Sequence, residues 1–218
     1  MLTKKIKFKN FREKKYSKKI LNDFKQLLKE KNTILESLSK SYKYSYSKKI
    51  VSKMKKYLHY RIIGMGGSIL GTEAIYDFLK EKVNKNFYFA NNLQSLKKLP
   101  KKNYTNLIVS KSGNTLETIS NLNILIKKKQ KSFVISENNN NYLALLAKKL
   151  KFEIIHHNNF IGGRYSVLSE VGMLPAELMG LNEKKFKQLN NLVKNKRFVK
   201  SLVSNVSTTL NFVKKKKV

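Results

Sequence analysis

The sequence contains no cysteine and no tryptophan, only two prolines, and only 13 acidic residues against 47 lysines and arginines. The absence of cysteine excludes disulfide bonds and thiolate metal ligands. No apolar run approaches the roughly 20 residues of a membrane-spanning helix, and the first residues lack the apolar segment of a signal peptide. We therefore expect a soluble cytoplasmic protein with no metal, no cofactor and no membrane partner.

The positive charge, formally +34, suggests nucleic-acid binding, because lysines gain affinity by releasing counterions from phosphate backbones. Asparagine, isoleucine, phenylalanine and tyrosine are also abundant, however, as expected for a genome rich in A and T. A dedicated nucleic-acid surface favours arginine, whose planar group binds phosphate and guanine through paired hydrogen bonds. Arginine occurs only at Arg12, Arg61, Arg164 and Arg197. We interpret most lysines as solvated surface and keep nucleic-acid binding as an alternative.

The 218 residues suit one large domain or one domain with an appendage, and 41% hydrophobic residues can form a real core. In residues 1–57, apolar residues recur at helical spacing, as at Leu21, Phe24, Leu27 and Leu28. We predict a helical N-terminal extension over residues 1–57, a main domain over 58–182 and a helical C-terminal segment over 183–218.

Strand-like and helix-like segments alternate in the main domain. Short apolar runs, each ending in polar residues, lie at 60–66, 86–92, 106–113, 132–139 and 152–159. Helical patterns fall between them at 71–83, 115–129 and 141–150. Parallel strands need crossover connections, which are usually helices. The pattern therefore predicts an α/β domain with a doubly wound parallel sheet, and ligands of such sheets bind at the carboxyl ends of the strands.

Glycines follow the first predicted strand in the sequence "GMGGSILG", residues 64–71. Gly66 and Gly67 would let the backbone turn sharply and approach a ligand. Ser68 would lie near the start of the next helix, where free N–H groups favour an anion. The same glycines could serve only to pack a helix tightly on the sheet.

A dinucleotide-binding fold would produce a similar glycine pattern. A nicotinamide site also expects an acidic residue at the end of the second strand, where it binds the ribose hydroxyls. Here the second strand is followed by Asn91 and Asn92. The sequence therefore does not favour a dinucleotide.

The sequence "SKSGNTLET", residues 110–118, follows the third predicted strand and begins a helix. Its hydroxyl groups and the helix amides could surround a phosphate, with Lys111 adding a full charge. It is not a Walker loop, which requires GxxxxGK[ST]. The alternative is that Ser112 and Thr115 only cap the helix, with Glu117 favourable in its first turn.

A third feature is "GGRYSVLSEVGMLPAELMG", residues 162–180. Arg164 stands at the entrance of a helix that is apolar on several sides, so that helix is expected to be buried. An arginine at its entrance needs an anionic partner or a solvent-filled cleft. Pairing with a surface carboxylate is the alternative, but two phosphate-like loops in the same chain favour a functional cation.

These three segments occur in the order and context of the glucose-6-phosphate isomerase family, which this chain resembles over about residues 55–182. The family's core consists of sugar-isomerase (SIS) domains, which are αβα sandwiches. The segment "GGRYSVLSxVG" is similar to a signature pattern of the family and is the most specific part of the resemblance. The loop at 112–114 differs from the family's commoner threonine-rich version but keeps hydroxyl groups at both ends.

The resemblance implies a hexose 6-phosphate as substrate and a homodimer as the assembly. It implies that Arg164 stabilises the enediolate oxygen during proton transfer between C1 and C2, with Gly163, Lys111 and Glu117 in the same catalytic site. The phosphate-binding residues that it implies are Gly67, Ser68, Ser110, Lys111, Ser112, Gly113, Asn114 and Thr115.

The family's catalytic glutamate lies in a later "ESxGK"-type segment, and no matching segment follows residue 182. We interpret His59, His156 and His157 as structural rather than as the family's ring-opening histidine. We therefore expect this chain to be a fragment of a full isomerase, ending before a second SIS domain. The alternatives are a non-catalytic phosphosugar-binding SIS module and the basic nucleic-acid binder.

Overall fold

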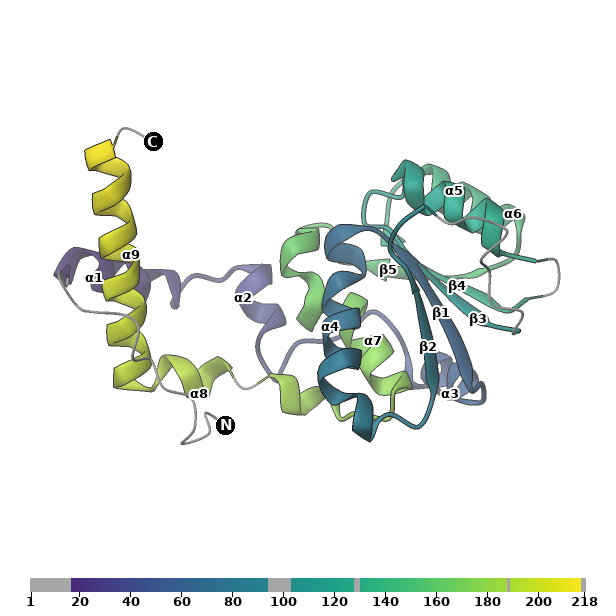
Figure 1. Cartoon of the computed structure of the whole chain (residues 1–218), viewed down its shortest axis with the longest axis horizontal. Coiled ribbons are helices and arrows are strands. Elements are labelled where there is room, and N and C mark those ends of the chain that lie inside the picture. The colour runs from purple at the N-terminus through teal and green to yellow at the C-terminus, as the bar shows by residue number, and fades with distance from the viewer. Residues whose placement is uncertain (1–16, 94–102, 128–129, 188, 217–218) are drawn as a thin grey trace. The chain divides into compact units, whose positions relative to one another are not determined.

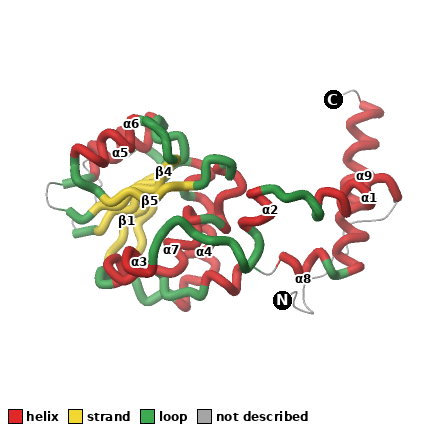
Figure 2. Tube along the Cα trace, turned by 180° about the vertical axis from the view of Figure 1, so that it is seen from behind, coloured by secondary structure: helices red, strands yellow, loops and turns green. Residues whose placement is uncertain are grey.

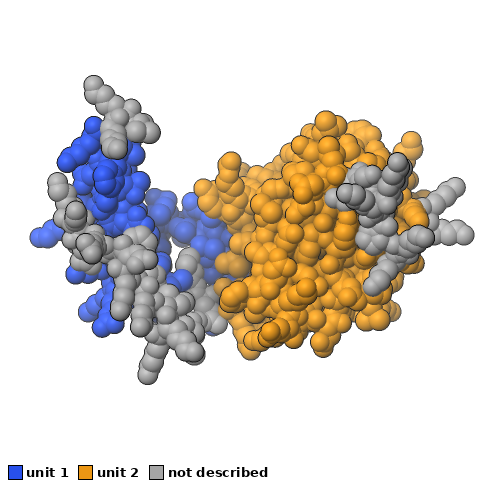
Figure 3. Space-filling model, in the orientation of Figure 1, with its two compact units in different colours: residues 1–42, 187–218 blue, residues 43–186 orange. Residues whose placement is uncertain are grey.

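A computed structural model of the chain describes residues 17–93, 103–127, 130–187 and 189–216 (Figure 1). Two compact units divide the chain. One is residues 43–186, and the other combines residues 1–42 with residues 187–218 (Figure 3). Every residue of the candidate site lies in the first of these units, which we call the α/β unit.

The α/β unit contains a five-stranded sheet in the order β2-β1-β3-β4-β5, in which all neighbours are parallel (Figure 1). Its strands are β1 (His59–Gly64), β2 (Asn86–Ala90), β3 (Thr105–Val109), β4 (Ser132–Glu137) and β5 (Glu153–His157). Central strands β1, β3 and β4 are almost entirely buried, as expected for a parallel sheet covered on both faces. The predicted doubly wound α/β fold is confirmed.

Helices cover both faces of this sheet (Figure 2). One face packs against α5 (Leu116–Leu125) and α6 (Tyr142–Lys149), and the other against α3 (Lys48–Lys55) and α7 (Glu170–Leu178). Helix α4 (Leu70–Leu79) lies against α7. The short 3₁₀ turns are η1 (Gly66–Ser68), η2 (Lys80–Lys82), η4 (Gly163–Leu168) and η5 (Glu183–Phe186).

The direction of the crossovers reverses between β1 and β3. Strand β1 pairs with β2 on one side and with β3 on the other, and Gly64 is in register with Val109. The chain leaves both strands at the same level, at the carboxyl edge of the sheet. In doubly wound folds this reversal point is where ligands bind, and both polar loops singled out in the sequence begin there.

The second unit is helical in its described residues. Its helices are α1 (Lys18–Leu27), α2 (Thr33–Ser37), α8 (Leu189–Val193) and α9 (Lys196–Lys216). Helix α1 contacts α9, and Leu21 and Phe24 on the predicted apolar face of α1 are partly buried, while Leu27 and Leu28 remain exposed. None of the helices within the described ranges is long and apolar enough to cross a membrane.

A buried tyrosine joins α3 to the sheet. The Tyr60 side chain is fully buried, and its hydroxyl lies 2.7 Å from Met54 O and 2.9 Å from Tyr57 O, both at the end of α3. Burial raises the pKa of Tyr60 to about 12. The hydroxyl therefore stays protonated in the folded chain at a pH where an unfolded tyrosine would ionise.

Tyr60→Phe should reduce the free energy of unfolding by about 1–2 kcal/mol at pH 7, because the phenol's hydrogen bonds are lost. The raised pKa adds a pH dependence, since the unfolded tyrosine ionises near pH 10 while the folded one does not. Its contribution to stability is full below pH 10 and is lost as pH rises toward 12, by up to about 3 kcal/mol. The unaltered chain should therefore lose stability faster than Tyr60→Phe between pH 9 and 12.

Urea denaturation at several pH values measures this difference. Tyr142→Phe is the control, because the Tyr142 side chain is exposed at the start of α6. Parallel stability curves for the unaltered chain and Tyr60→Phe above pH 9 would contradict the assignment.

Candidate functional site

The loop after β1 turns tightly through its glycines. Gly66 has a φ of +54°, in the left-handed region where a side chain is strained, and Gly66–Ser68 form the turn η1 before α4. A Cβ on Gly64 would lie only 3.0 Å from Val109 O, at the end of the neighbouring strand. The glycines thus allow the backbone after β1 to turn beside the end of β3, and Ser68 lies partly buried at the end of this turn.

The turn η4, which carries Arg164, packs directly on the turn η1. A Cβ on Gly67 would lie 2.4 Å from both C and O of Gly163, and 2.9 Å from Arg164 N. Ser166 Oγ lies 2.7 Å from Gly163 O and 3.2 Å from Gly67 O, so it links the two turns. The structure therefore brings together Gly67, Gly163 and the backbone of Arg164, which are far apart in the sequence.

The Arg164 side chain is exposed, and it forms no ion pair with any residue in the described ranges. The buried helix predicted after it is present as α7, in which eight of the nine residues are buried. A guanidinium group at this position is available to an anion from solvent.

The loop after β3 is organised by two hydroxyl groups. Ser110 is 2% exposed, and its Oγ lies 3.1 Å from Thr115 Oγ1 and accepts a hydrogen bond from Gly113 N at 3.2 Å. Gly113 has a φ of +66°. Thr115 is at the N-cap position of α5, but its side chain makes no hydrogen bond to the helix. The capping alternative is therefore wrong for Thr115, and its hydroxyl does not satisfy the first N–H groups of α5.

Lys111 is paired with an acidic residue that the sequence analysis missed. Its Nζ lies 2.9 Å from Oε1 of Glu137, the last residue of β4, and both side chains are mostly buried. Glu137 N also donates to Lys111 O at 3.0 Å. Glu137 could have been noticed as an acid at the end of a predicted strand. The ammonium group has three donors, so it can bind a second anion while keeping Glu137.

Two residues of the predicted loop hold the start of α6. A Cβ on Gly113 would lie 1.8 Å from Asn141 Oδ1, which accepts from Ala144 N at 2.8 Å as the N-cap of α6. Asn114 Oδ1 accepts from Tyr142 N at 3.0 Å. Gly113 and Asn114 therefore fix the loop against the start of α6. The contact of Gly113 with Asn141 could not be seen in the sequence.

The remaining predicted positions are near helix and strand ends. Glu117 lies partly buried in the first turn of α5. At the end of β2, Asn91 Nδ2 donates to Glu73 Oε2 at 2.8 Å, and Asn92 O accepts from Asn121 Nδ2 at 2.8 Å. Asn91 and Asn92, which argued against a dinucleotide site, thus form structural hydrogen bonds with α4 and α5.

The histidines lie at the ends of strands rather than in the loops after β1 and β3. His157 is buried at the end of β5, where Nε2 lies 3.0 Å from Ile161 O and Nδ1 lies 3.3 Å from Glu170 Oε2. His59 Nδ1 is buried at the opposite end of the sheet, and His156 is exposed. Among the residues that the structure describes, no group of three or more acidic or histidine side chains could hold a metal ion.

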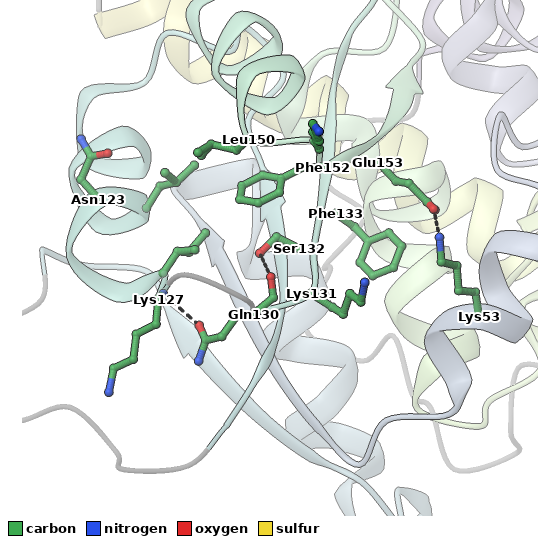
Figure 4. A pocket seen from close by; sticks show the side chains of 13 residues that line it. Lys53, Asn123, Lys127, Gln130, Lys131, Ser132, Phe133, Leu150, Phe152 and Glu153 are labelled. Carbon is green, nitrogen blue, oxygen red and sulfur yellow. Dashed lines mark hydrogen bonds and ion pairs between the residues drawn. The ribbon is translucent and has the colours of Figure 1, made fainter.

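A cavity of about 440 Å³ lies at the amino-terminal edge of the sheet (Figure 4). Its lining comes from the ends of α5 and α6, the starts of β4 and β5, and Lys53 of α3. It includes three further lysines, Lys127, Lys131 and Lys151. None of the predicted site residues lines this cavity. It is therefore separate from the loops at the carboxyl edge.

Proteins of known structure share this fold. The structure matches the crystal structure of hypothetical protein TT0462 from Thermus thermophilus with a TM-score of 0.63 and 19% identity, over 89% of this chain and 51% of that one. It also matches tagatose-6-phosphate ketose/aldose isomerase from Escherichia coli with a TM-score of 0.52 and 13% identity, over 74% of this chain and 47% of that one. At these identities the likeness establishes a fold shared with these two proteins and nothing about activity.

The sequence then gives the family. A model of the phosphoglucose isomerase family matches residues 6–215, and the chain belongs to that family. A glucose-6-phosphate isomerase from Methanocaldococcus jannaschii is 34% identical over 155 residues, which are 64% of this chain and 38% of that relative. One from Borreliella burgdorferi is 34% identical over 186 residues, 70% of this chain and 35% of that relative. The chain thus spans little more than a third of the length of these relatives.

Gly67→Ala should disrupt the packing of η1 on η4, because the added methyl group would meet the Gly163 backbone. We expect a loss of about 1–3 kcal/mol in the free energy of unfolding, as for other overpacked sites. We also expect altered backbone amide NMR signals at Gly163 and Arg164.

Gly162→Ala is the matched control, since its Cβ would meet only Tyr165 Cδ2, at an ordinary 3.6 Å. If the two variants proved equally stable, the close approach of Gly67 to Gly163 would be refuted.

Proposed function

We propose that this chain provides the phosphosugar-binding SIS domain of a glucose-6-phosphate isomerase, which interconverts glucose 6-phosphate and fructose 6-phosphate. Family membership and the names of the relatives support this activity. The structural observation that carries the proposal is the contact of Gly67 with Gly163 and Arg164. It supports the proposal because the backbone of Arg164, whose side chain has no ionic partner among the described residues, lies beside the loop that leaves β1.

In this proposal the phosphate binds between the loops that follow β1 and β3. Gly67 and Ser68 contribute from the first loop, and the helix dipole of α5 attracts the anion from the second. Lys111 adds a charge-assisted hydrogen bond. Ser112 and Thr115 supply hydroxyl groups, while Ser110, Gly113 and Asn114 keep the loop in shape through the hydrogen bonds already described.

The reaction moves a proton between two neighbouring carbons. Removing a proton next to a carbonyl builds negative charge on the oxygen, and a cation fixed beside that oxygen lowers the barrier. Arg164 takes this role, with the Gly163 backbone beside it and Glu117 in the same site. Stabilisation of this kind is commonly worth about 10²–10³ in rate.

A general base is required as well, and a positioned base commonly contributes about 10²–10⁴ in rate. We assign the base to a part of the isomerase that this chain does not contain. The isolated chain is therefore expected to bind a hexose phosphate and to convert it slowly or not at all. We extend the proposal to a homodimer in the cytoplasm.

Lys111→Ala should weaken fructose 6-phosphate binding about tenfold or more, because a charge-assisted hydrogen bond contributes about 1.5–3 kcal/mol. Ser112→Ala should weaken it about fivefold, since a neutral hydrogen bond contributes about 1 kcal/mol. Isothermal titration calorimetry in a buffer free of phosphate measures both effects.

Lys127→Ala is the control, because it removes the same charge from an exposed position at the opposite edge of the sheet. It should leave the affinity unchanged. Unaltered affinity in Lys111→Ala would reject the phosphate site. Steeply salt-dependent DNA binding that survives Ser110→Ala and Arg164→Ala would instead favour the nucleic-acid alternative.

A further inference from the structure

The buried imidazole ring of His157 forms hydrogen bonds with residues on both sides of Arg164. His157 is the last residue of β5 and is 2% exposed. Its Nε2 lies 3.0 Å from Ile161 O, just before the glycine pair, and its Nδ1 lies 3.3 Å from Oε2 of Glu170, in the first turn of α7. Residues 158–169, with Arg164 near the middle, therefore lie between His157 and Glu170, whose side chains meet.

The partners of His157 define the hydrogen bonds of its ring. A backbone carbonyl can only accept, so Nε2 must carry a hydrogen to bond with Ile161 O. Glu170 is 1% exposed, and its Oε1 accepts from Ser45 N at 3.2 Å. One hydrogen shared between Nδ1 and Oε2 completes the pair, which then carries no net charge and suits a site that water does not reach.

The outer side of this segment is open to solvent. Phe160 is 79% exposed, and the Arg164 and Tyr165 side chains are exposed as well. The inner side is anchored by the fully buried Ile161, by the packing of Gly163 against Gly67 and by the hydrogen bonds of Ser166. The position of the exposed Arg164 side chain therefore depends on how firmly the backbone is held on this inner side and at the two ends of the segment.

We propose that His157 and Glu170 are positioning residues for Arg164. Their pair closes the segment 158–169 and holds the guanidinium where negative charge develops on the substrate. This inference rests on the role given to Arg164 under the proposed function. It adds that the position of the guanidinium depends on two residues that do not touch the substrate.

The decisive comparison is between Glu170→Ala and Glu170→Gln. The glutamine amide can donate to Nδ1 of a neutral His157 ring and accept from Ser45 N, while Nε2–H remains on Ile161 O. Glu170→Gln therefore keeps both hydrogen bonds of the His157 ring with a neutral side chain, whereas Glu170→Ala removes the one to Nδ1. Glu177→Ala is the control, because Glu177 lies two turns further along α7 and binds Tyr46 Oη at 2.7 Å, away from the segment.

Amide hydrogen exchange in the chain without ligand is the first readout. Glu170→Ala should speed exchange across residues 160–165 by about tenfold or more, with Glu170→Gln within about threefold of the unaltered chain. Glu177→Ala should lower the thermal midpoint without this local change. Unchanged exchange in Glu170→Ala, or equal acceleration in Glu177→Ala, overturns the inference.

Nitrogen-15 NMR of the histidine ring is the second readout and needs no variant to fold. His157 should carry a hydrogen on Nε2 in the unaltered chain, and a ring whose only hydrogen is on Nδ1 overturns the hydrogen bond to Ile161 O. Turnover of an isomerase that contains this chain is the third. Glu170→Ala should lower kcat about tenfold or more with a smaller change in KM, and Glu177→Ala should leave kcat unchanged. An unchanged kcat in Glu170→Ala overturns the positioning role. If the unaltered chain did not bind fructose 6-phosphate, the proposed function would be refuted. Amide hydrogen exchange would still show whether His157 and Glu170 hold the segment 158–169.

Discussion

The close approach of two glycine backbones, at Gly67 and Gly163, is the constraint on which the rest of the candidate site depends. No side chain on Gly67 fits against the Gly163 backbone, whereas a Cβ on Gly163 would lie an ordinary 3.9 Å from Gly67 Cα. A Cβ on Gly71 would likewise lie 2.7 Å from Val167 Cγ2, and one on Gly172 would lie 2.1 Å from Val167 O. The turns and helices at this edge therefore pack too closely for side chains at these glycines, and a distant segment of the chain can bring Arg164 to the loop after β1.

Charge at this edge is arranged differently from charge on the rest of the surface. The chain has a formal charge of +34, and most of its lysines in the described ranges are exposed to solvent. Lys111 is instead mostly buried and ion-paired with Glu137 at the end of β4. Arg164 has no ionic partner among the described residues and is exposed beside η1. The Lys111 ammonium group is thus paired with a residue of the sheet, and the Arg164 guanidinium group is available to a ligand. This arrangement suits a site for an anionic ester.

Periodicity in the sequence was sufficient to predict the alternating strands and helices, because strands and amphipathic helices repeat at different intervals. The loops at the carboxyl edge could also be predicted, since glycines and hydroxyl residues follow two strands. The pairs of side chains that shape the site could not be predicted from the sequence. Lys111 meets Glu137, and His157 meets Glu170, only through strand register and helix placement. Capping of α5 by the Thr115 side chain was an alternative to phosphate binding, and the structure instead pairs the Thr115 hydroxyl with that of Ser110.

The central claim is that the loops after β1 and β3 and the turn carrying Arg164 bind one phosphorylated sugar together. Titration of the nitrogen-15-labelled chain with fructose 6-phosphate, followed by NMR, tests this most directly. The account predicts that the backbone amides of Ser68, Ser112 and Gly163 shift along a single saturating curve with one dissociation constant. Shifts confined to one of these segments, or separate dissociation constants for each, would contradict it.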